Sequence, residues 1–299
     1  MKEKIREGLQ KGKYRESGSG GYINAEAGWT DYLISERIIF SHRINDYSAG
    51  DLLEELHAHG YYELTLNAAG EGVQYISDGQ GIVVEPGMAI LTKPLKFHVF
   101  RLDAPICYDR YVLYFRDPSA VFPDCSVMDF VGMGNDSFAA FALSGQRLLT
   151  QIRAAEAALS DADTPYAMAK AYLEICGLFL TLSDQKTISA RSVHPPQFIS
   201  CIKEYIDANF LQIHSVSDVA AHFFYSREYI SRSFRQYYNT PVYEYILKRK
   251  ILYCCMLLED GENVETAARS AGFGNMSSFI KVFRRYNGCT PSEYRAKTR

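Results

Sequence analysis

The sequence lacks several features that would place it in a specialised class of protein. Among its 299 residues no apolar run approaches the roughly 18 residues of a membrane-spanning helix. The N-terminus, Met1 to Arg6, is charged and has no secretory signal pattern, so we expect a cytoplasmic protein without a membrane partner. Seven scattered cysteines without C-x-x-C spacing argue against a disulfide framework and a zinc site. No nucleophile–base set or phosphate-binding loop is evident, so we predict neither an enzyme nor a cofactor.

A strong net charge is also missing, but the charge is unevenly distributed. The formal net charge is −3 at pH 7, which alone would not indicate a nucleic-acid partner. Residues 195–299 hold 14 Lys and Arg against 10 Asp and Glu, whereas residues 1–194 hold 18 against 25. A modestly basic C-terminal part on an acidic body is typical of a polyanion-binding module joined to a second domain.

The N-terminal half has the pattern of a β domain. From about Tyr32 to Phe115, short apolar or alternating runs are separated by turn-forming residues such as Gly70-Glu71-Gly72 and Glu85-Pro86-Gly87. Many short strands at this spacing predict a small antiparallel barrel or sandwich. Two amphipathic helices follow, with apolar positions such as Leu148, Ile152 and Ile175 at helical spacing.

The C-terminal part contains the same short pattern twice. Val-x-x-x-Ala opens each copy, at Val216 and at Val264, and Glu-Tyr closes each copy, at Glu244-Tyr245 and at Glu293-Tyr294. Two copies are too few for a solenoid, which needs at least about three repeats. They suffice for a tandem pair of small recognition units.

Each copy is predicted to contain a short helix, a tight turn and a second helix. The capping-box pattern from Ser215 to Asp218 opens the first short helix. In the second copy Gly272 lies in the turn, where glycine adopts a positive φ without strain. The first copy has Phe224 near that place, so we expect its turn to be made differently. A long helix from Val242 to Leu258 joins the two copies.

The second helix of each copy has a polar, basic face opposite its apolar face. An exposed helix with such residues at i, i+1 and i+4 intervals can enter the major groove of DNA, although a plain solvated face is the alternative for any single helix. Its appearance twice in the basic part of the chain favours DNA binding. The outward residues are Arg227, Glu228, Ser231, Arg232 and Arg235 in the first copy and Met276, Ser277, Lys281, Arg284 and Arg285 in the second.

The last hundred residues resemble a known family. The segments that carry the resemblance are Ala271-Gly272-Phe273, Ser278-Phe279, Phe283-Arg284-Arg285-Tyr286 and the run from Gly288 to Arg295. They are similar to the signature of the AraC/XylS family of bacterial transcription regulators. The resemblance implies two helix-turn-helix units joined by one long helix, with both recognition helices in successive major grooves of double-stranded DNA.

The resemblance also implies particular DNA-contacting residues. The matching positions are Arg227, Glu228, Ser231 and Arg232 in the first unit, and Asn275, Met276, Ser277, Ser278 and Lys281 in the second. From charge and helix geometry we expect phosphate contacts from Arg235, Lys248, Arg249, Lys250, Arg284 and Arg285.

A second group of residues with chemical potential lies in the β domain. The order His57, His59 and Glu63, followed by His98, resembles that of the cupin barrel, whose metal-binding members use two His, a Glu and a later His. Residues 57, 59 and 63 would share one face of a strand. An unbroken strand would hold positions 57 and 63 about 20 Å apart. We therefore expect the chain to bend, and Gly60 is the evident place.

Three interpretations of this group remain open. The side chains of His57, His59, Glu63 and His98 would suit zinc, iron or manganese. Alternatively, they line a pocket for a small effector, together with Tyr61 and Tyr75, as regulators of the AraC type commonly do without metal. Purely structural histidines are the third interpretation. We favour the effector pocket, so no metal or other cofactor is predicted.

The combined prediction is a multidomain α+β protein. It consists of a flexible tail (1–21), a cupin-like antiparallel β-barrel for the effector (22–142), a helical dimerisation element (143–184), a linker (185–196) and an all-α tandem helix-turn-helix domain (197–299). The expected partners are double-stranded DNA, a sugar or other polar metabolite, a second copy of the chain and, for an activator, RNA polymerase. The helix pair of the dimerisation element either covers the barrel only or also pairs with that second copy.

Overall fold

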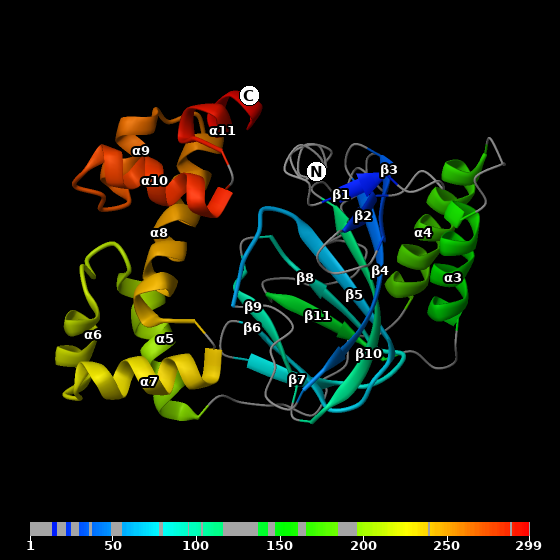
Figure 1. Cartoon of the computed structure of the whole chain (residues 1–299), viewed down its shortest axis with the longest axis horizontal. Helices are drawn as coiled ribbons and strands as arrows, with labels where there is room; N and C mark the ends of the chain where they lie inside the picture. The colour runs from blue at the N-terminus through cyan, green and yellow to red at the C-terminus, as the bar shows by residue number, and fades with distance from the viewer. Residues whose placement is uncertain are drawn as a thin grey trace. The chain divides into compact units, whose positions relative to one another are not determined.

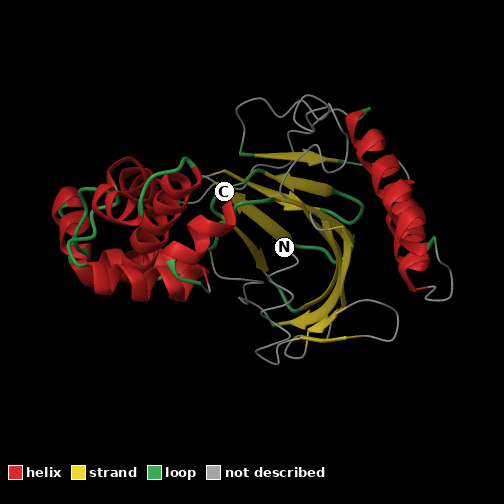
Figure 2. Cartoon of the chain, turned by 90° about the horizontal axis from the view of Figure 1, so that it is seen from above, coloured by secondary structure: helices red, strands yellow, loops and turns green. Residues whose placement is uncertain are grey.

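A computed structural model describes most of the chain (Figures 1 and 2). The described residues are 14–16, 22–24, 30–35, 38–48, 56–77, 80–94, 96–102, 104–115, 137–142, 147–160, 166–184, 196–238, 240–287 and 289–298. The predicted linker therefore lies outside them, apart from Pro196. Contacts divide the chain into two compact units, Met1–Leu53 with His59–Val193 and Glu54–Ala58 with His194–Arg299. Within the described ranges no helix is long and apolar enough to cross a membrane.

The first unit contains two antiparallel sheets. Its described strands are β1 (Tyr14–Glu16), β2 (Tyr22–Asn24), β3 (Thr30–Ser35), β4 (Ile38–Tyr47), β5 (Tyr62–Ala69), β6 (Val73–Ser77), β7 (Gln80–Val84), β8 (Ala89–Thr92), β9 (His98–Leu102), β10 (Ile106–Phe115) and β11 (Phe138–Phe141). The larger sheet has the order β1-β2-β3-β4-β10-β5-β8-β11, and the smaller one has the order β7-β6-β9. β1 lies inside the segment that composition predicts to be a flexible tail.

The predicted β-barrel is confirmed only as an antiparallel β domain. In the part of the chain that the structure describes, no backbone pairing joins the eight-stranded sheet to the three-stranded sheet. Closure into a cupin-like barrel is therefore not shown. The sequence pattern identifies the strands because each has the alternation or apolar run of a half-buried strand, but it carries little information on which distant strands pair.

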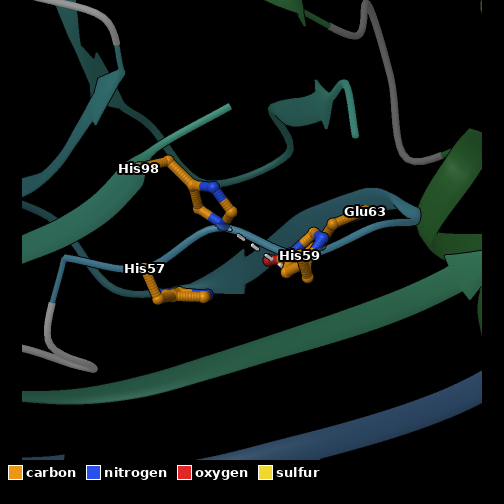
Figure 3. Close-up of side chains that lie close together, drawn as sticks. All are labelled: His57, His59, Glu63 and His98. Carbon is orange, nitrogen blue, oxygen red and sulfur yellow. Dashed lines mark hydrogen bonds and ion pairs between the residues drawn. The ribbon is translucent and has the colours of Figure 1, made fainter. Parts of the chain in front are cut away.

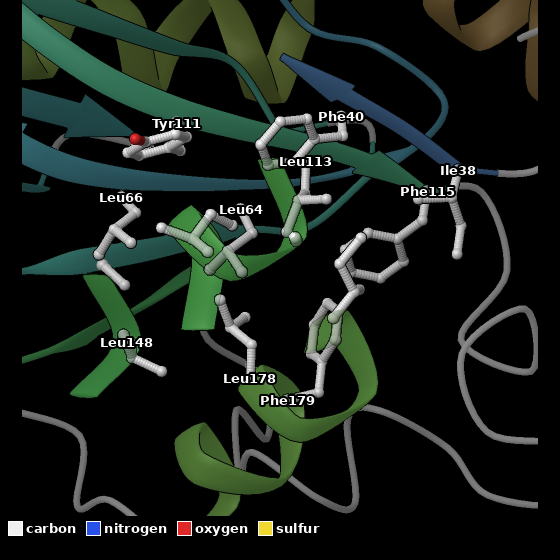
Figure 4. Packing of buried hydrophobic residues seen from close by; sticks show 14 of the residues in the cluster. Ile38, Phe40, Leu64, Leu66, Tyr111, Leu113, Phe115, Leu148, Leu178 and Phe179 are labelled. Atoms are coloured by element: carbon white, nitrogen blue, oxygen red, sulfur yellow. The ribbon is translucent and has the colours of Figure 1, made fainter. Parts of the chain in front are cut away.

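One face of the larger sheet packs against two helices, α3 (Arg147–Ser160) and α4 (Ala167–Ser183). Because side chains alternate along a strand, Tyr111, Leu113 and Phe115 of β10 all point to this face. Figure 4 shows them with residues of both helices, and the Phe115 and Phe179 rings lie 5.1 Å apart. The positions predicted for the apolar side of α3 are buried, namely Leu148, Ile152, Ala155 and Leu159. The helix pair is thus a cover for the sheet, as one interpretation predicted.

A polar cluster also joins α3 to the sheet. His42 of β4 contacts Glu156 of α3 through Nδ1 (2.7 Å) and Asp109 of β10 through Nε2 (2.7 Å). The ring stacks on Tyr111, whose hydroxyl donates to Glu156. Burial alone would lower the pKa of His42, but the two carboxylates outweigh it and raise that pKa. A charged imidazole, with a proton on each nitrogen, satisfies both carboxylates.

The opposite side of α4 is exposed and partly apolar. Tyr166, which precedes the helix, is 68% exposed, Leu173 is 69% exposed and Leu180 is 46% exposed. These residues are seven positions apart, so they lie on one side of the helix. Ile175, Phe179 and Leu182 lie on the other side and are buried against the sheet.

The second unit is helical in its described C-terminal residues. Its helices are α5 (Gln197–Asn209), α6 (Val216–Phe223), α7 (Arg227–Tyr238), α8 (Val242–Glu259), α9 (Val264–Ser270), α10 (Met276–Asn287) and α11 (Pro291–Thr298). The predicted capping box at α6 is present, because Asp218 accepts from the Ser215 backbone N–H (2.9 Å). Ser226 caps α7, accepting from Tyr229 N (3.1 Å). The joining helix α8 closely matches its predicted bounds.

The two turns use the same backbone conformation, contrary to our expectation. Phe224 has φ 57°, and it is the sole non-glycine residue with a positive φ in the described chain; Gly272 has φ 76°. The αL residue lets the chain leave the short helix in the same direction in both copies. At Gly272 a side chain would be crowded, because an added Cβ would lie 3.0 Å from Leu211 O. Phe224 is 95% exposed, so its side chain meets no such obstacle.

Replacing Phe224 by glycine should stabilise the helical unit. A non-glycine αL residue costs about 1–2 kcal/mol, and glycine costs about 0.5–1 kcal/mol in unfolded-chain entropy. The expected net gain for Phe224→Gly is about 0.5–1 kcal/mol in the free energy of unfolding, measured by urea denaturation with far-UV circular dichroism. As the matched control, Gly272→Ala should destabilise the unit. A lower midpoint for Phe224→Gly than for wild type would contradict this assignment.

Candidate nucleic-acid interface and histidine cluster

The helix α7 separates apolar and polar residues onto opposite sides. Ile230, Phe234 and Tyr238 are buried. These positions recur every four residues and form one buried stripe, so the polar residues between them lie on the exposed side of the helix. The exposed predicted DNA-contacting residues are Arg227, Glu228, Arg232 and Arg235, and Ser231 is half-buried beside them. The basic face of the first unit is therefore accessible.

The helix α10 repeats this arrangement. Phe279 and Phe283 are buried in the core beneath it. All of the predicted DNA-contacting positions here are exposed, namely Asn275, Met276, Ser277, Ser278, Lys281, Arg284 and Arg285. Asn275 has a structural task as well, because its Oδ1 accepts from Ser278 N (2.9 Å) at the start of the helix. Arg285 pairs with Glu244 of α8 (3.2 Å).

Three consecutive basic residues of α8 that are predicted to contact phosphate are used inside the protein. Lys248 Nζ donates to Leu56 O (2.9 Å). Lys250 of α8 is buried, and its Nζ donates to Ile213 O (3.0 Å). Burial also lowers the pKa of Lys250. Arg249 pairs with Asp207 of α5 through Nε (3.1 Å). Sequence charge alone gives no sign of this, because the α5–α8 contact is tertiary. Arg235 and Arg284 remain as exposed cations beside the recognition faces.

Sequence reasoning missed two exposed aromatic residues next to α7. Tyr225 and Tyr229 are 51% and 43% exposed, and their rings stack with centroids 5.0 Å apart. The ring of Phe198 from α5 lies beside them, 4.8 Å from Tyr225. The helical spacing could have indicated that Tyr229 faces outward, because it is three residues before Arg232 and one after Glu228, which are both predicted to face outward. These tyrosines extend the outward face of α7.

The histidine cluster lies in the β domain around Glu63 (Figure 3). His59 Nε2 is 2.8 Å from Glu63 Oε2, and His98 Nε2 is 3.5 Å from the same oxygen. Thr65 donates to the other carboxylate oxygen (3.0 Å). Burial would raise the pKa of Glu63, but hydrogen bonds from His59 and His98 hold it well below its ordinary value. A buried carboxylate is thus kept ionised by two imidazoles.

Both imidazoles are oriented by the backbone. His59 Nδ1 donates to Tyr61 O (2.8 Å), and His98 Nδ1 donates to Lys96 O (2.9 Å). Each ring therefore directs Nε2 towards Glu63. Metal-ligating histidines use the same device, in which a second acceptor fixes the tautomer and the ring orientation.

The chain does bend between His57 and Glu63, as predicted. The strand β5 begins only at Tyr62, so the expectation that residues 57, 59 and 63 share one face of a strand is wrong. In an unbroken strand, positions 57 and 63 would be about 20 Å apart. With the bend at Gly60, the ligand atoms of His57, His59, Glu63 and His98 lie within 4.8 Å of one another.

The two tyrosines predicted for an effector pocket flank the cluster. Tyr61 stacks on His59 with a centroid distance of 3.9 Å, and Tyr75 lies 5.8 Å from His98. Tyr75 is fully buried, and its hydroxyl is paired with Thr92 Oγ1 (2.7 Å). Tyr61 is half-buried. Both aromatic residues therefore shape the surroundings of the cluster.

The cluster fits a divalent metal ion chemically. Three imidazoles and one carboxylate are a donor set for zinc, iron or manganese, with nitrogen and oxygen ligands at about 2.0–2.2 Å. Donors on opposite sides of such an ion are about 4 Å apart at these bond lengths, so a spread of 4.8 Å needs only a small contraction. In the described part of the chain no other group of three or more His, Cys, Asp or Glu residues has such a geometry.

Comparisons with known proteins agree with the helical arrangement. A family model described as a helix-turn-helix domain matches residues 219–297. The regulatory protein SoxS of Salmonella typhimurium is 33% identical over 100 residues, which cover 33% of this chain and 94% of SoxS. These matches define a helix-turn-helix protein. The chain belongs to the AraC/XylS family of transcription regulators.

Other similar proteins differ in how much of their length is matched. The putative HTH-type transcriptional regulator YkgA of Escherichia coli (strain K12) is 29% identical over 111 residues, which cover 37% of this chain and 46% of YkgA. The chain thus spans about half the length of that relative. A structure of ToxT from Vibrio cholerae is 15% identical, covers 86% of this chain and 98% of ToxT, and has a TM-score of 0.36.

Proposed function

We propose that the protein is a sequence-specific DNA-binding transcription regulator whose N-terminal β domain binds a small effector. The observation that carries the DNA-binding part is the pair of helices α7 and α10. Each buries aromatic residues and exposes basic and polar residues at its N-terminal half. The joining helix α8 has 18 residues and is therefore about 27 Å long. With its turns it spans about one turn of B-DNA, which lets the recognition helices enter successive major grooves.

The proposal assigns different tasks to the exposed side chains. Arg232 and Lys281 lie on the outward faces of α7 and α10, where they contact base edges. Arg235 and Arg284 lie towards the C-terminal ends of these helices, where they contact phosphates and fix the position on the duplex. A chain with these tasks acts in the cytoplasm. It regulates transcription rather than catalysing a reaction, and contact with RNA polymerase accompanies activation.

Replacing Arg232 or Lys281 by alanine tests the base contacts. Each change should weaken binding to the preferred operator, obtained by selection from random DNA, by about 1–3 kcal/mol and relax specificity at one base position. Arg235→Ala should instead weaken binding to all sequences and reduce the salt slope by about one unit. Fluorescence anisotropy at several salt concentrations measures both effects.

The matched control is Arg153→Ala, which removes an exposed arginine from α3 in the β-domain unit. Its DNA affinity should equal that of wild type. Wild-type binding that does not depend on salt or on sequence would contradict the proposed function.

The effector is proposed to lie at His57, His59, Glu63 and His98, with Tyr61 and Tyr75 as aromatic walls. A sugar or other polar metabolite suits the hydrogen-bonding groups of this cluster. An effector that binds one conformation of the protein more tightly shifts the equilibrium towards it. By linkage, effector and operator change each other's affinity by the same factor.

A divalent metal ion is the second candidate for this cluster, favoured by the fixed orientation of the His59 and His98 rings. Cobalt(II), used as a spectroscopic probe, should bind with one equivalent per chain and give ligand-field absorption. His98→Gln should reduce its affinity by at least about 10-fold, because it removes one donor of the set. His214→Gln, at an exposed position ahead of α6, is the control. Equal cobalt affinity in wild type and His98→Gln would exclude the metal site.

The second copy of the chain is proposed to pair through the exposed stripe of α4. Tyr166, Leu173 and Leu180 are apolar and exposed, and their seven-residue spacing is that of a helix–helix seam. Leu173→Asn should shift sedimentation from dimer towards monomer, whereas Arg153→Gln on α3 should not. A dimer that persists unchanged in the double variant Leu173→Asn, Leu180→Asn would show that this seam is not the interface.

A further inference from the structure

A buried arginine in the β domain has no carboxylate partner among the residues that the structure describes. Arg110 of β10 is only 4% exposed, and its Nη2 donates to the hydroxyl of Tyr47 (3.3 Å). The guanidinium lies over the rings of Tyr108 (5.0 Å) and Tyr47 (5.9 Å). No carboxylate of the described residues lies within ion-pair distance of it. Burial of a charge without a counter-ion is costly, so the fold alone does not account for an arginine here.

Three buried polar atoms on residues that are neighbours in the sheet are left without a hydrogen-bond partner among the described residues. They are Arg110 Nη1, the Tyr108 hydroxyl and Asn67 Oδ1. Asn67 of β5 is directly opposite Arg110 in the strand register, so both side chains point to the same face. Tyr108 is two residues before Arg110, and its ring is already in contact with the guanidinium. All three are on the sheet face opposite the α3–α4 helices.

The surroundings hold these three groups in place. The Asn67 side-chain N–H₂ donates to Gly70 O (3.0 Å) and to Val84 O (3.0 Å), which fixes which end of the amide is the acceptor. A Cβ at Gly70 would lie 3.0 Å from Tyr108 Cδ2, so the backbone there approaches the ring closely. A register shift occurs between Asp109 and Arg110, and such bulges re-aim side chains at binding sites.

The protonation states decide what the three atoms offer to a ligand. Burial raises the pKa of the Tyr108 hydroxyl, so it stays protonated and donates. Arg110 Nη1 offers charged N–H donors, whereas Asn67 Oδ1 is an acceptor only. Two neighbouring donors, one of them charged, match a carboxylate. The adjacent acceptor matches a hydroxyl group.

We infer that the β domain binds a small monoanionic hydroxycarboxylate, with its carboxylate on Arg110 and Tyr108 and its hydroxyl on Asn67. One uncompensated positive charge selects a monoanion over a phosphate dianion. The neighbouring Arg43, directly opposite Arg110 in the β4–β10 register, is linked to the Asp31 carboxylate through Ser41, to which it donates (3.1 Å) and which donates to Asp31. Tyr108 belongs to an apolar cluster with Val73, Ile90 and Phe100, which contacts the carbon skeleton of the ligand. This ligand is additional to the effector proposed at the histidine cluster, and the inference rests on the proposed function only in taking it to act as an effector.

Glycolate, the smallest hydroxycarboxylate, tests the site in the full-length protein without DNA. Thermal unfolding should show a glycolate-dependent stabilisation at millimolar concentrations, as mass action requires for a ligand of the folded state. Glycolamide has the same shape without the charge and should give no stabilisation, and inorganic phosphate should give none. Acetate, which lacks the hydroxyl, should bind more weakly than glycolate. Equal stabilisation by glycolate and glycolamide, or none by glycolate, would overturn the inference.

Two variants separate a binding role from a structural one. Tyr108→Phe should weaken glycolate binding about 10- to 100-fold, the effect of losing a hydrogen bond to a charged group. Arg110→Gln should abolish glycolate stabilisation while the melting temperature of the ligand-free protein stays the same or rises, because an uncompensated buried charge is removed. Arg153→Gln should behave as wild type. A lower melting temperature for ligand-free Arg110→Gln, with glycolate stabilisation retained, would make the arginine structural. Because DNA is absent, a failure of the DNA-binding proposal would not alter these results.

Discussion

The alternation of side chains along β10 is the constraint on which the N-terminal domain depends. This strand lies between β4 and β5 in the larger sheet, and its residues from Asp109 to Phe115 are paired on both sides. Tyr111, Leu113 and Phe115 enter the core beneath α3 and α4. Tyr108 and Arg110 point the other way, to the face that also carries Glu63 and Asn67 of β5. A shift of one residue in this register would exchange the two sets and would bury Arg110 against the helices.

The sequence predicted local features well and nonlocal ones poorly. Strand positions, the Ser215–Asp218 capping box and the exposed faces of α7 and α10 follow from periodicity and side-chain chemistry over a few residues. Nothing in the local sequence marks Arg110 as a binding residue, because its meeting with Asn67 depends on a pairing across more than 40 residues of chain. The bend near Gly60 is predictable from chain length alone, because without it the histidines and Glu63 are too far apart to meet.

In the helical unit, too, the type of a residue does not by itself show what the residue contacts. A run of three basic residues in α8 reads as a phosphate-binding patch, yet Lys250 is buried on Ile213 O and Arg249 is paired with Asp207. These contacts connect α8 to Ile213, just before the first copy of the repeat, and to α5. The joining helix therefore uses two of its charges to hold α5 and the segment that leads into the first copy. The cations that remain outside are mostly those of the recognition helices. Likewise, Phe224 adopts the αL turn that glycine would favour, because the direction of the chain is set by the helices on either side.

The polar contact between α3 and the sheet depends on the protonation of His42. His42 satisfies Glu156 and Asp109 together only while it carries a proton on both nitrogens. Since its pKa is raised in the folded protein, its contribution is complete in mildly acid solution, below the ordinary value for histidine of about 6.5, and is lost as the pH rises through the raised value. Tyr111 and the apolar contacts of α3 do not change over that interval. The helix pair is thus held by one interaction that responds to protons and many that do not, so alkaline solution loosens this junction selectively.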